Sequence, residues 1–226
     1  MDETSKERLY PRLRREPSAS TVKDSLPVLF FGDLFSARVA TIGINPSDRE
    51  YLDAHGSELA EMARRFETLS SLDVASRNTL TDDQCERAIA RMRDYFQRER
   101  TIYAWFRPLE RVLRGMGRSF TTGEAVHLDL VQEATKQTWS GLPRDEAQAL
   151  LACDLPFLRW QIEIFPLRVL IRNGGTALDT VTGMLGGTLT TSGSFRLITW
   201  HVGRAAVSAR SIGFLARIRR SPNRPA

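Results

Sequence analysis

Residues 37–47 read Ala-Arg-Val-Ala-Thr-Ile-Gly-Ile-Asn-Pro-Ser, an apolar run that ends in a glycine and a polar turn. A run of this length, rich in β-branched residues and closed by Gly, Asn and Pro, is typical of a buried strand followed by a loop. Three further runs have the same character: residues 125–131 (AVHLDLV), 167–172 (LRVLIR) and 195–200 (FRLITW). We therefore expect four strands, the first at residues 37–43.

The segments around these runs carry apolar residues at spacings of three and four, which predicts helices. Strands that alternate with helices favour right-handed crossovers and parallel pairing. The expected fold is therefore α/β, a three-layer sandwich with a central four-stranded, mostly parallel sheet flanked by helices. The predicted helices lie at residues 57–69, 82–98, 102–116, 142–165, 176–185 and 204–218.

The length and composition of the chain favour a single globular domain. The chain has 226 residues, of which 42% are hydrophobic, enough to build a substantial core. Residues 1–26 are polar and interrupted by Pro11 and Pro17, so we expect a mobile or peripheral basic arm before one domain at 27–226. With no run near the ~20 apolar residues of a membrane span and no secretory signal pattern, we expect a cytoplasmic monomer with no membrane partner.

The charge of the chain suggests a nucleic-acid partner. The formal net charge is +5, and most of the positive charge is arginine, which pairs with phosphates and stacks on bases. A solvated basic surface without a ligand is the alternative. Cys85 and Cys153 are far apart and lack CxxC spacing, so they cannot by themselves hold a zinc ion or an iron–sulfur cluster. We expect no metal and no cofactor.

Polar residues stand at the ends of the predicted strands. In open α/β sheets, ligands bind outside the carboxyl ends of the strands. Asn45 and Ser47 follow the first strand, Asp129 ends the second, Asn173 follows the third and His201 follows the fourth. We expect these groups to face one ligand site.

The motifs at these strand ends resemble those of a known family. The order GINPS (43–47), HLDLV (127–131), VLIRNGG (169–175) and ITWH (198–201) resembles the uracil-DNA glycosylase superfamily over residues 28–208. GINPS is similar to the GINPG motif of the mismatch-specific uracil/thymine glycosylases. The resemblance implies a four-stranded parallel sheet and a DNA glycosylase that flips a nucleotide and hydrolyses its N-glycosidic bond.

The resemblance also implies roles for particular residues. Asn45 would position the attacking water, and His201 would donate to O2 of the departing base; these are the expected catalytic residues. Ile44, Ser47 and Phe66 would bind the base, with Phe66 stacking beneath it. Ser47 stands where the classical uracil enzymes carry a tyrosine that blocks bulky C5 substituents. The alternatives are that Ser47 caps a helix and that Phe66 belongs to the core.

Asp129 departs from the family pattern, which has an asparagine that reads the base edge. A carboxylate only accepts hydrogen bonds, so Asp129 would repel O4 of uracil and favour an exocyclic amine. With the open wall at Ser47, this favours a C5-modified cytosine, such as hydroxymethylcytosine or its glucosylated form in phage DNA, and a role in antiviral defence. Alternatively, Asp129 pairs structurally with an arginine or with His127, which we interpret as a structural strand residue.

Several residues are expected to contact DNA. Arg204 or Val207 would fill the vacated base stack, an apolar wedge being more usual. The remaining expected DNA-binding residues are Arg65, Ser208 and Arg210.

Other functions remain open at this point. No catalytic lysine stands in the motifs, so the glycosylase is expected to be monofunctional and to leave an abasic site. The alternatives are repair of uracil or other deaminated bases, a non-catalytic DNA-binding module, and a hydrolase of free nucleotides or nucleosides.

Overall fold

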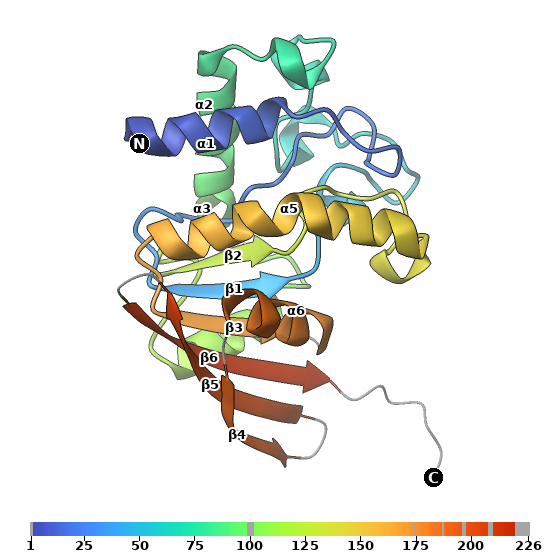
Figure 1. Ribbon diagram of the computed structural model, residues 1–226. Helices are drawn as coiled ribbons and strands as arrows, with labels where there is room; N and C mark the ends of the chain where they lie inside the picture. Colours follow the sequence, from blue (N-terminus) through green and yellow to red (C-terminus); the bar gives the residue numbers. More distant parts are fainter. Residues whose placement is uncertain are drawn as a thin grey trace.

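A mixed six-stranded sheet forms the centre of the protein, with strand order β2-β1-β3-β6-β5-β4 (Figure 1). The computed structural model describes residues 2–98, 102–173, 175–186, 188–195, 198–207 and 210–219; side chains are described up to residue 186, except those of residues 173, 175, 176 and 178. The predicted α/β class, with a sheet flanked by helices, is confirmed. The predicted count of four strands is wrong.

Three strands with parallel pairing position the candidate site. β1 (Val39–Gly43) lies between β2 (Ala125–Asp129) and β3 (Val169–Asn173), and its pairing with both is parallel. All five residues of β1 and all five of β2 are buried. Burial on both faces explains why these strands appear in the sequence as continuous apolar runs.

The C-terminal part of the sheet differs from the prediction. β6 (Arg210–Arg219) pairs with β3 in parallel, β5 (Ile198–Val207) pairs with β6 antiparallel, and β4 (Thr188–Phe195) pairs with β5 antiparallel. Residues 204–207 and 210–218, predicted to be helical, therefore belong to two strands. The pairing of β6 with the open edge of β3 satisfies backbone donors and acceptors along the segment, and this tertiary contact outweighs a helical apolar spacing.

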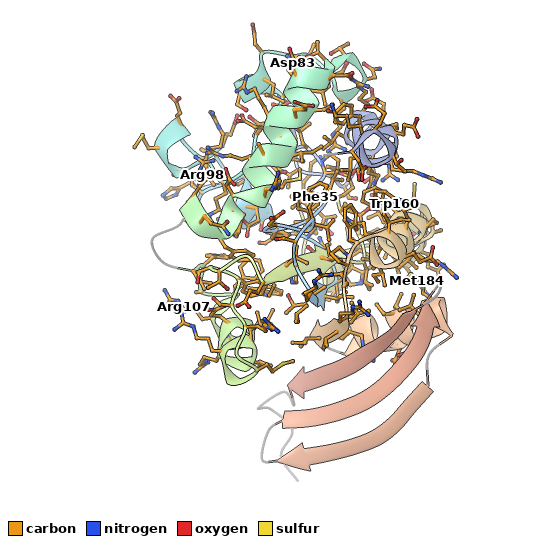
Figure 2. The ribbon with its side chains drawn as sticks, turned by 90° about the vertical axis from the view of Figure 1, so that its left-hand side faces the viewer. Phe35, Asp83, Arg98, Arg107, Trp160 and Met184 are labelled. Carbon is orange, nitrogen blue, oxygen red and sulfur yellow. The ribbon has the colours of Figure 1, made fainter. Side chains whose placement is uncertain are left out.

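Helices cover both faces of the sheet. Figure 2 shows α4, marked by Arg107, on one side of the strands, and α5, marked by Trp160, on the other. Beyond β2, the helices α1 and α2 lie at the top of the molecule in Figure 1. The helix bounds are α1 Glu3–Arg14, α2 Asp82–Arg93, α3 Tyr95–Arg98, α4 Arg107–Gly115, α5 Arg144–Ile164 and α6 Gly175–Leu185.

Two further predicted helices are wrong in part or in whole. Residues 57–69 contain only a short 3₁₀ turn at Glu61–Ala63, and a second turn, Ser70–Leu72, follows. The first turn buries none of its residues, so no packed apolar face stabilises a helix there. The helix predicted for 102–116 begins only at Arg107, with a proline in its first turn, where its missing N–H costs nothing.

The N-terminal segment is part of the core, which corrects the expectation of a mobile or peripheral arm. Leu9 and Leu13 of α1 are fully buried. Arg12 Nη2 lies 2.7 Å from Asp154 Oδ2, and Arg15 Nη2 lies 2.7 Å from Asp154 Oδ1, so two arginines attach this segment to α5. We did not predict a helix at α1 because the segment is mostly polar and buries only one narrow apolar face. Across the part of the chain that the structure describes, no helix is long and apolar enough to cross a membrane.

Candidate active site

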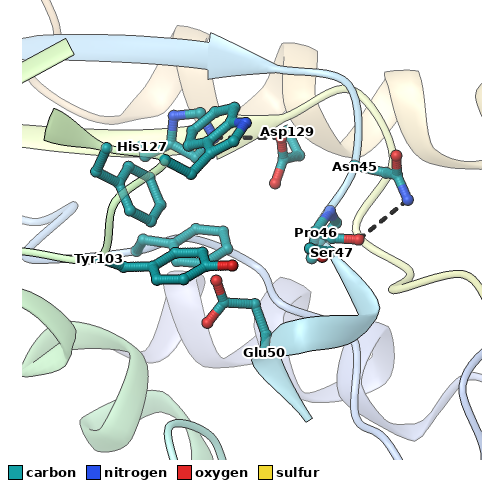
Figure 3. A pocket seen from close by; sticks show the side chains of 10 residues that line it. Asn45, Pro46, Ser47, Glu50, Tyr103, His127 and Asp129 are labelled. Atoms are coloured by element: carbon teal, nitrogen blue, oxygen red, sulfur yellow. Dashed lines mark hydrogen bonds and ion pairs between the residues drawn. The ribbon is translucent and has the colours of Figure 1, made fainter. Parts of the chain in front are cut away.

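A pocket opens at the carboxyl ends of β1 and β2, where α/β sheets bind ligands (Figure 3). It contains about 300 Å³ of empty space, part of it open to solvent. We call it the β1–β2 pocket. It is lined by Phe31, Asn45, Pro46, Ser47, Glu50, Tyr103, Trp105, Phe106, His127 and Asp129.

Strand register places an acidic side chain over the end of β1. Gly43 is the register partner of Asp129 on the neighbouring strand. A Cβ atom on Gly43 would lie 2.4 Å from Asp129 Oδ1 and 3.0 Å from His127 Nε2, far inside normal contact distances. The absence of a side chain at Gly43 therefore makes room for the Asp129 carboxylate.

His127 holds Asp129 in place. Its Nε2 lies 3.2 Å from Asp129 Oδ1, and its Nδ1 lies 2.7 Å from Thr41 Oγ1. Since a carboxylate only accepts, Nε2 carries the hydrogen, and in the neutral ring Nδ1 accepts from the Thr41 hydroxyl. His127 thus has the structural role that we predicted, and in addition it lines the pocket.

The second oxygen of Asp129 is buried without a partner among the described residues. Asp129 is 3% exposed, and its Oδ2 has no hydrogen-bond partner among the described residues. In Figure 3 the carboxylate of Asp129 extends toward the space above Glu50. A buried oxygen without a partner is costly, and a donor from a bound molecule would relieve that cost.

Glu50 is a second acidic group in the pocket, and the sequence pattern did not indicate it. It ends the 3₁₀ helix Asp48–Glu50 and is 3% exposed. Tyr95 Oη donates to its Oε2 at 2.9 Å, and Arg65 Nη1 lies 3.4 Å from the same oxygen. The one available signal was the Ser47-x-x-Glu50 spacing, which is that of a helix capping box rather than of a ligand site.

The surroundings of Glu50 favour its neutral form. Burial is the main reason why the pKa of Glu50 rises from 4.5 to about 7. Arg65 and Tyr95 oppose this rise, whereas the negative charge of Asp129 adds to it. Near neutral pH, Glu50 is therefore both a possible proton donor and a possible acceptor.

Aromatic side chains form the walls of the pocket. Tyr103, Trp105 and Phe106 come from the segment before α4, and Phe31 comes from the segment before β1. The Trp105 ring lies 5.0 Å from the ring of His127 and is 45% exposed. We did not predict this wall, because residues 102–106 were expected to be helical. In the structure the helix begins only at Arg107. Flat aromatic faces are suited to a planar ligand.

Asn45 lies at the rim, where its amide group is fixed by neighbouring oxygens. Its Nδ2 donates to Pro46 O at 3.1 Å, to Thr135 Oγ1 at 3.0 Å and more weakly to Glu133 O at 3.4 Å. Backbone carbonyls only accept hydrogen bonds, so the atom of the Asn45 amide that faces Pro46 O and Glu133 O is the nitrogen. Oδ1 is the acceptor at the other end of the amide. Figure 3 shows the Asn45 amide turned away from Asp129 and Glu50.

A second hollow lies on the other side of the Asn45–Ser47 loop. Its lining includes Thr135, Lys136, Gln137 and Trp139, and it shares the loop with the β1–β2 pocket. Within the described residues, no group of three or more His, Cys, Asp or Glu side chains is placed to hold a metal ion.

The other predicted base-binding residues have different positions. Ser47 lines the pocket mouth, and its Oγ also accepts from Arg49 N at 3.2 Å, so it caps the following 3₁₀ helix. Ile44 is half-buried, and its carbonyl accepts from Val131 N; it does not line either hollow. Phe66 is 1% exposed and stacks on Tyr95, so it lies in the aromatic core behind the pocket instead of forming its wall.

Arg65 lies beside pocket residues and its contact with DNA stays a prediction, whereas His201 lies away from its predicted catalytic position. The Arg65 guanidinium lies 4.2 Å from the Tyr103 ring centre and its Nη1 lies 3.4 Å from Glu50 Oε2, so it contacts two pocket-lining residues without lining the pocket itself. His201 lies within antiparallel β5, three strands from β1, which at ~4.8 Å per strand places its backbone roughly 14 Å away. The structure therefore does not bring His201 beside Asn45.

The remaining predicted DNA-binding residues lie where side chains are not described. Arg204 and Val207 belong to β5, and Arg210 begins β6. Ser208 lies outside the described residues. Their contacts with DNA stay predictions.

Comparison with known proteins adds no assignment. No protein-family model matches the chain, and no curated protein matches it.

Proposed function

We propose that this protein is a monofunctional DNA glycosylase that flips a nucleotide into the β1–β2 pocket and hydrolyses its N-glycosidic bond, leaving an abasic site. The proposed substrate is a C5-modified cytosine. The observation that carries the proposal is the unpartnered, buried Oδ2 of Asp129 in an aromatic-walled pocket at the strand end that bears Asn45.

The aromatic walls support a nucleobase as the ligand. A flipped base loses its stacking partners, and contact with rings such as Trp105 and Tyr103 offsets that loss. Each base–aromatic contact contributes ~1–3 kcal/mol and tolerates any base. The walls therefore account for the binding of a base but not for the choice among bases.

Asp129 supports cytosine over uracil. Cytosine presents a 4-amino donor, and uracil presents a carbonyl oxygen at the same position. The free Oδ2 of Asp129 accepts from the amine and repels the carbonyl. Because His127 already occupies Oδ1, the carboxylate is held in one orientation toward the base.

The pocket mouth supports a substituent at C5. Ser47 is small and exposed there, and on its other side the Asn45–Ser47 loop borders the second hollow. A hydroxymethyl group, or a sugar attached to it, meets no bulky wall at Ser47. Such cytosines would be substrates in phage DNA, which places the proposed role in antiviral defence.

Asn45 would orient the attacking water through its Oδ1. An amide orients water but does not stabilise the developing cationic sugar as a carboxylate would, so the intrinsic rate should be modest. Among the described residues that line the β1–β2 pocket there is no lysine. A hydrolytic step that leaves an abasic site is therefore proposed instead of a lyase step through a Schiff base.

A panel of modified oligonucleotides tests the proposal. Single- and double-stranded substrates would carry uracil, hypoxanthine, hydroxymethylcytosine or its glucosylated form, and alkaline cleavage would reveal abasic sites. We expect release of a modified cytosine, with loss of at least tenfold in rate in Asn45→Ala. Asp129→Asn should shift preference toward uracil. Release of uracil alone by the wild type would contradict the cytosine assignment.

One observation favours a second candidate, a non-catalytic module that holds a flipped base. The Asn45 amide is turned away from Asp129 and Glu50, and its nitrogen is occupied by protein oxygens. This candidate predicts binding of the modified oligonucleotide without base release, and binding that is unchanged in Asn45→Ala. Base release that depends on Asn45 would exclude it.

A further inference from the structure

Glu50 and Asp129 face the same small space from two different elements. Glu50 comes from the 3₁₀ helix after β1, and Asp129 ends β2. Both are 3% exposed, and both line the β1–β2 pocket. In Figure 3 the carboxyl group of Glu50 rises toward Asp129 from the opposite wall. The pocket thus has two acidic groups that border the same space.

Among the described residues, the hydrogen-bond partners of each acidic group reach one of its two oxygens. Asp129 Oδ1 is bound by His127, which leaves Oδ2 unpartnered. The hydrogen bonds from Tyr95 and Arg65 both reach Glu50 Oε2. Neighbouring groups therefore fix the orientation of both carboxyl groups while one oxygen of each is directed to the pocket.

The two groups differ in their protein partners. Asp129 accepts from the Nε2–H of His127 at 3.2 Å, an interaction that requires an acceptor. Glu50 has Arg65 at 3.4 Å, the Tyr95 hydroxyl at 2.9 Å and the negative charge of Asp129 facing it; Tyr103, which packs against Arg65, completes its surroundings. Two buried carboxyl groups in one site retain a proton between them more readily than either would alone.

We propose that Glu50, as a neutral carboxylic acid, donates a hydrogen bond to the ring nitrogen N3 of an aminopyrimidine whose 4-amino group is accepted by Asp129. The proposal rests on the proposed function, because it names a second group that reads the base in the same pocket. Asp129 as the acceptor and Glu50 as the neighbouring donor would complement the edge of cytosine, which presents the N4 amine beside the N3 acceptor. Uracil presents the reverse order, O4 beside N3–H.

The proposal makes base reading depend on pH. The raised pKa of Glu50, about 7, means that its proton is present in weakly acidic solution and lost in alkaline solution. Once it is lost, two carboxylates face two adjacent positions of the base, and the N3 lone pair meets an acceptor. Cytosine binding should therefore weaken as pH rises through about 7.

A binding experiment that does not require catalysis tests this inference. Oligonucleotides would carry one non-hydrolysable 2′-fluoroarabino nucleotide with either 5-hydroxymethylcytosine or 5-hydroxymethyluracil, and Kd would be measured by fluorescence anisotropy at about pH 6 and about pH 8.5. We expect the wild type to prefer the cytosine oligonucleotide at the lower pH. The preference should fall about tenfold or more at the higher pH.

Glu50→Gln is the informative variant, because its amide donates a hydrogen bond at every pH. We expect it to keep the cytosine preference and to lose the pH dependence. Glu61→Gln is the matched control, an identical change at an exposed position, and it should behave like the wild type. A Glu50→Gln profile identical to that of the wild type, or a preference for uracil at the lower pH, would overturn the inference.

The result separates this inference from the proposed function. Cytosine binding with the expected pH profile but without base release from hydrolysable substrates would reject the glycosylase and keep the reading role of Glu50. Base release with a binding preference that is unchanged between the two pH values would do the opposite. If Glu50→Gln fails to fold, the wild-type profile alone decides, since a flat preference overturns the inference.

Discussion

Gly43 is the residue on which the geometry of the pocket most directly depends. It lies at the carboxyl end of β1, and its missing side chain leaves room for the carboxylate of Asp129. From the sequence, this glycine marks the end of a strand. Its packing role arises only because parallel register places Asp129 beside it.

Gly43→Ala should therefore damage the pocket more than the fold. The added Cβ would lie 2.4 Å from Asp129 Oδ1, so the Asp129–His127 contact must shift. We expect a loss of about 1–3 kcal/mol in the free energy of unfolding and the loss of cytosine binding, measured by urea denaturation and anisotropy. Gly115→Ala is the control, because a Cβ there meets nothing within 4 Å. Unchanged cytosine binding in Gly43→Ala would contradict the placement of Asp129.

Glu50 makes a second prediction at this scale, on stability. Its pKa is raised in the folded protein to about 7 from an ordinary 4.5. Between these values the folded state holds a proton that the unfolded state has released, so stability falls as pH rises. Glu50→Gln, which does not titrate, should gain stability relative to the wild type across this interval, by up to about 3 kcal/mol.

Urea denaturation at about pH 4.5 and about pH 8 measures this difference. Taking the difference between variant and wild type removes the contribution of all other titrating groups. Glu61→Gln should show a difference that does not vary with pH, because the position is exposed. A constant difference for Glu50→Gln as well would mean that its pKa is ordinary in the folded protein.

At the scale of elements, a buried ionic cluster joins several segments behind the site. Arg77, at the start of the 3₁₀ helix Arg77–Thr79, contacts both carboxylate oxygens of Glu133 at 2.9 Å and the backbone carbonyl of Ser25. Arg12 of α1 reaches Glu133 at 3.6 Å. Since the Glu133 carbonyl accepts from Asn45, the cluster also supports the site loop.

Removal of one partner of this cluster should be strongly destabilising. Arg77 and Glu133 are both fully buried, so Arg77→Met leaves a buried carboxylate with weaker compensation. We expect a loss of about 3–5 kcal/mol in the free energy of unfolding. The double variant Arg77→Met/Glu133→Leu should recover part of that loss, because the unpaired Glu133 carboxylate is gone while Arg12 keeps its ion pair with Asp154. Additive losses in the double variant would show that the pair is not coupled.

At the scale of the whole molecule, the net charge of +5 is relevant to the proposed DNA partner. Each phosphate contact made by a basic side chain releases counterions, which makes affinity depend on salt. A hydrolase of free nucleosides would show no such dependence. Salt therefore distinguishes a DNA enzyme from that alternative.

The affinity for a modified oligonucleotide should fall steeply as salt is added. We expect a slope of about −2 or steeper in a plot of log affinity against log salt, at about −0.9 per phosphate contact for duplex DNA. Anisotropy titrations over a range of KCl concentrations measure it. A slope near zero, together with hydrolysis of free nucleosides, would reject DNA as the substrate.

Part of the fold could be predicted because it depends on local pattern. The apolar runs that form β1 and β2 are buried on both faces, and such runs can be recognised without knowledge of their partners. The β5–β6 hairpin could not be predicted in this way. Its residues also fit a helical spacing, and only pairing with the open edge of β3 decides their conformation.

The sequence by itself determined that an Asn-Pro-Ser loop follows a buried strand and that an aspartate ends the next one. Only the tertiary structure decided that Glu50 faces Asp129, that Trp105 forms a wall and that Phe66 lies behind it. Strand ends are marked by local chemistry, so they are visible in the sequence. Which side chains meet across a pocket depends on register and on where a helix begins, and tertiary packing decides both.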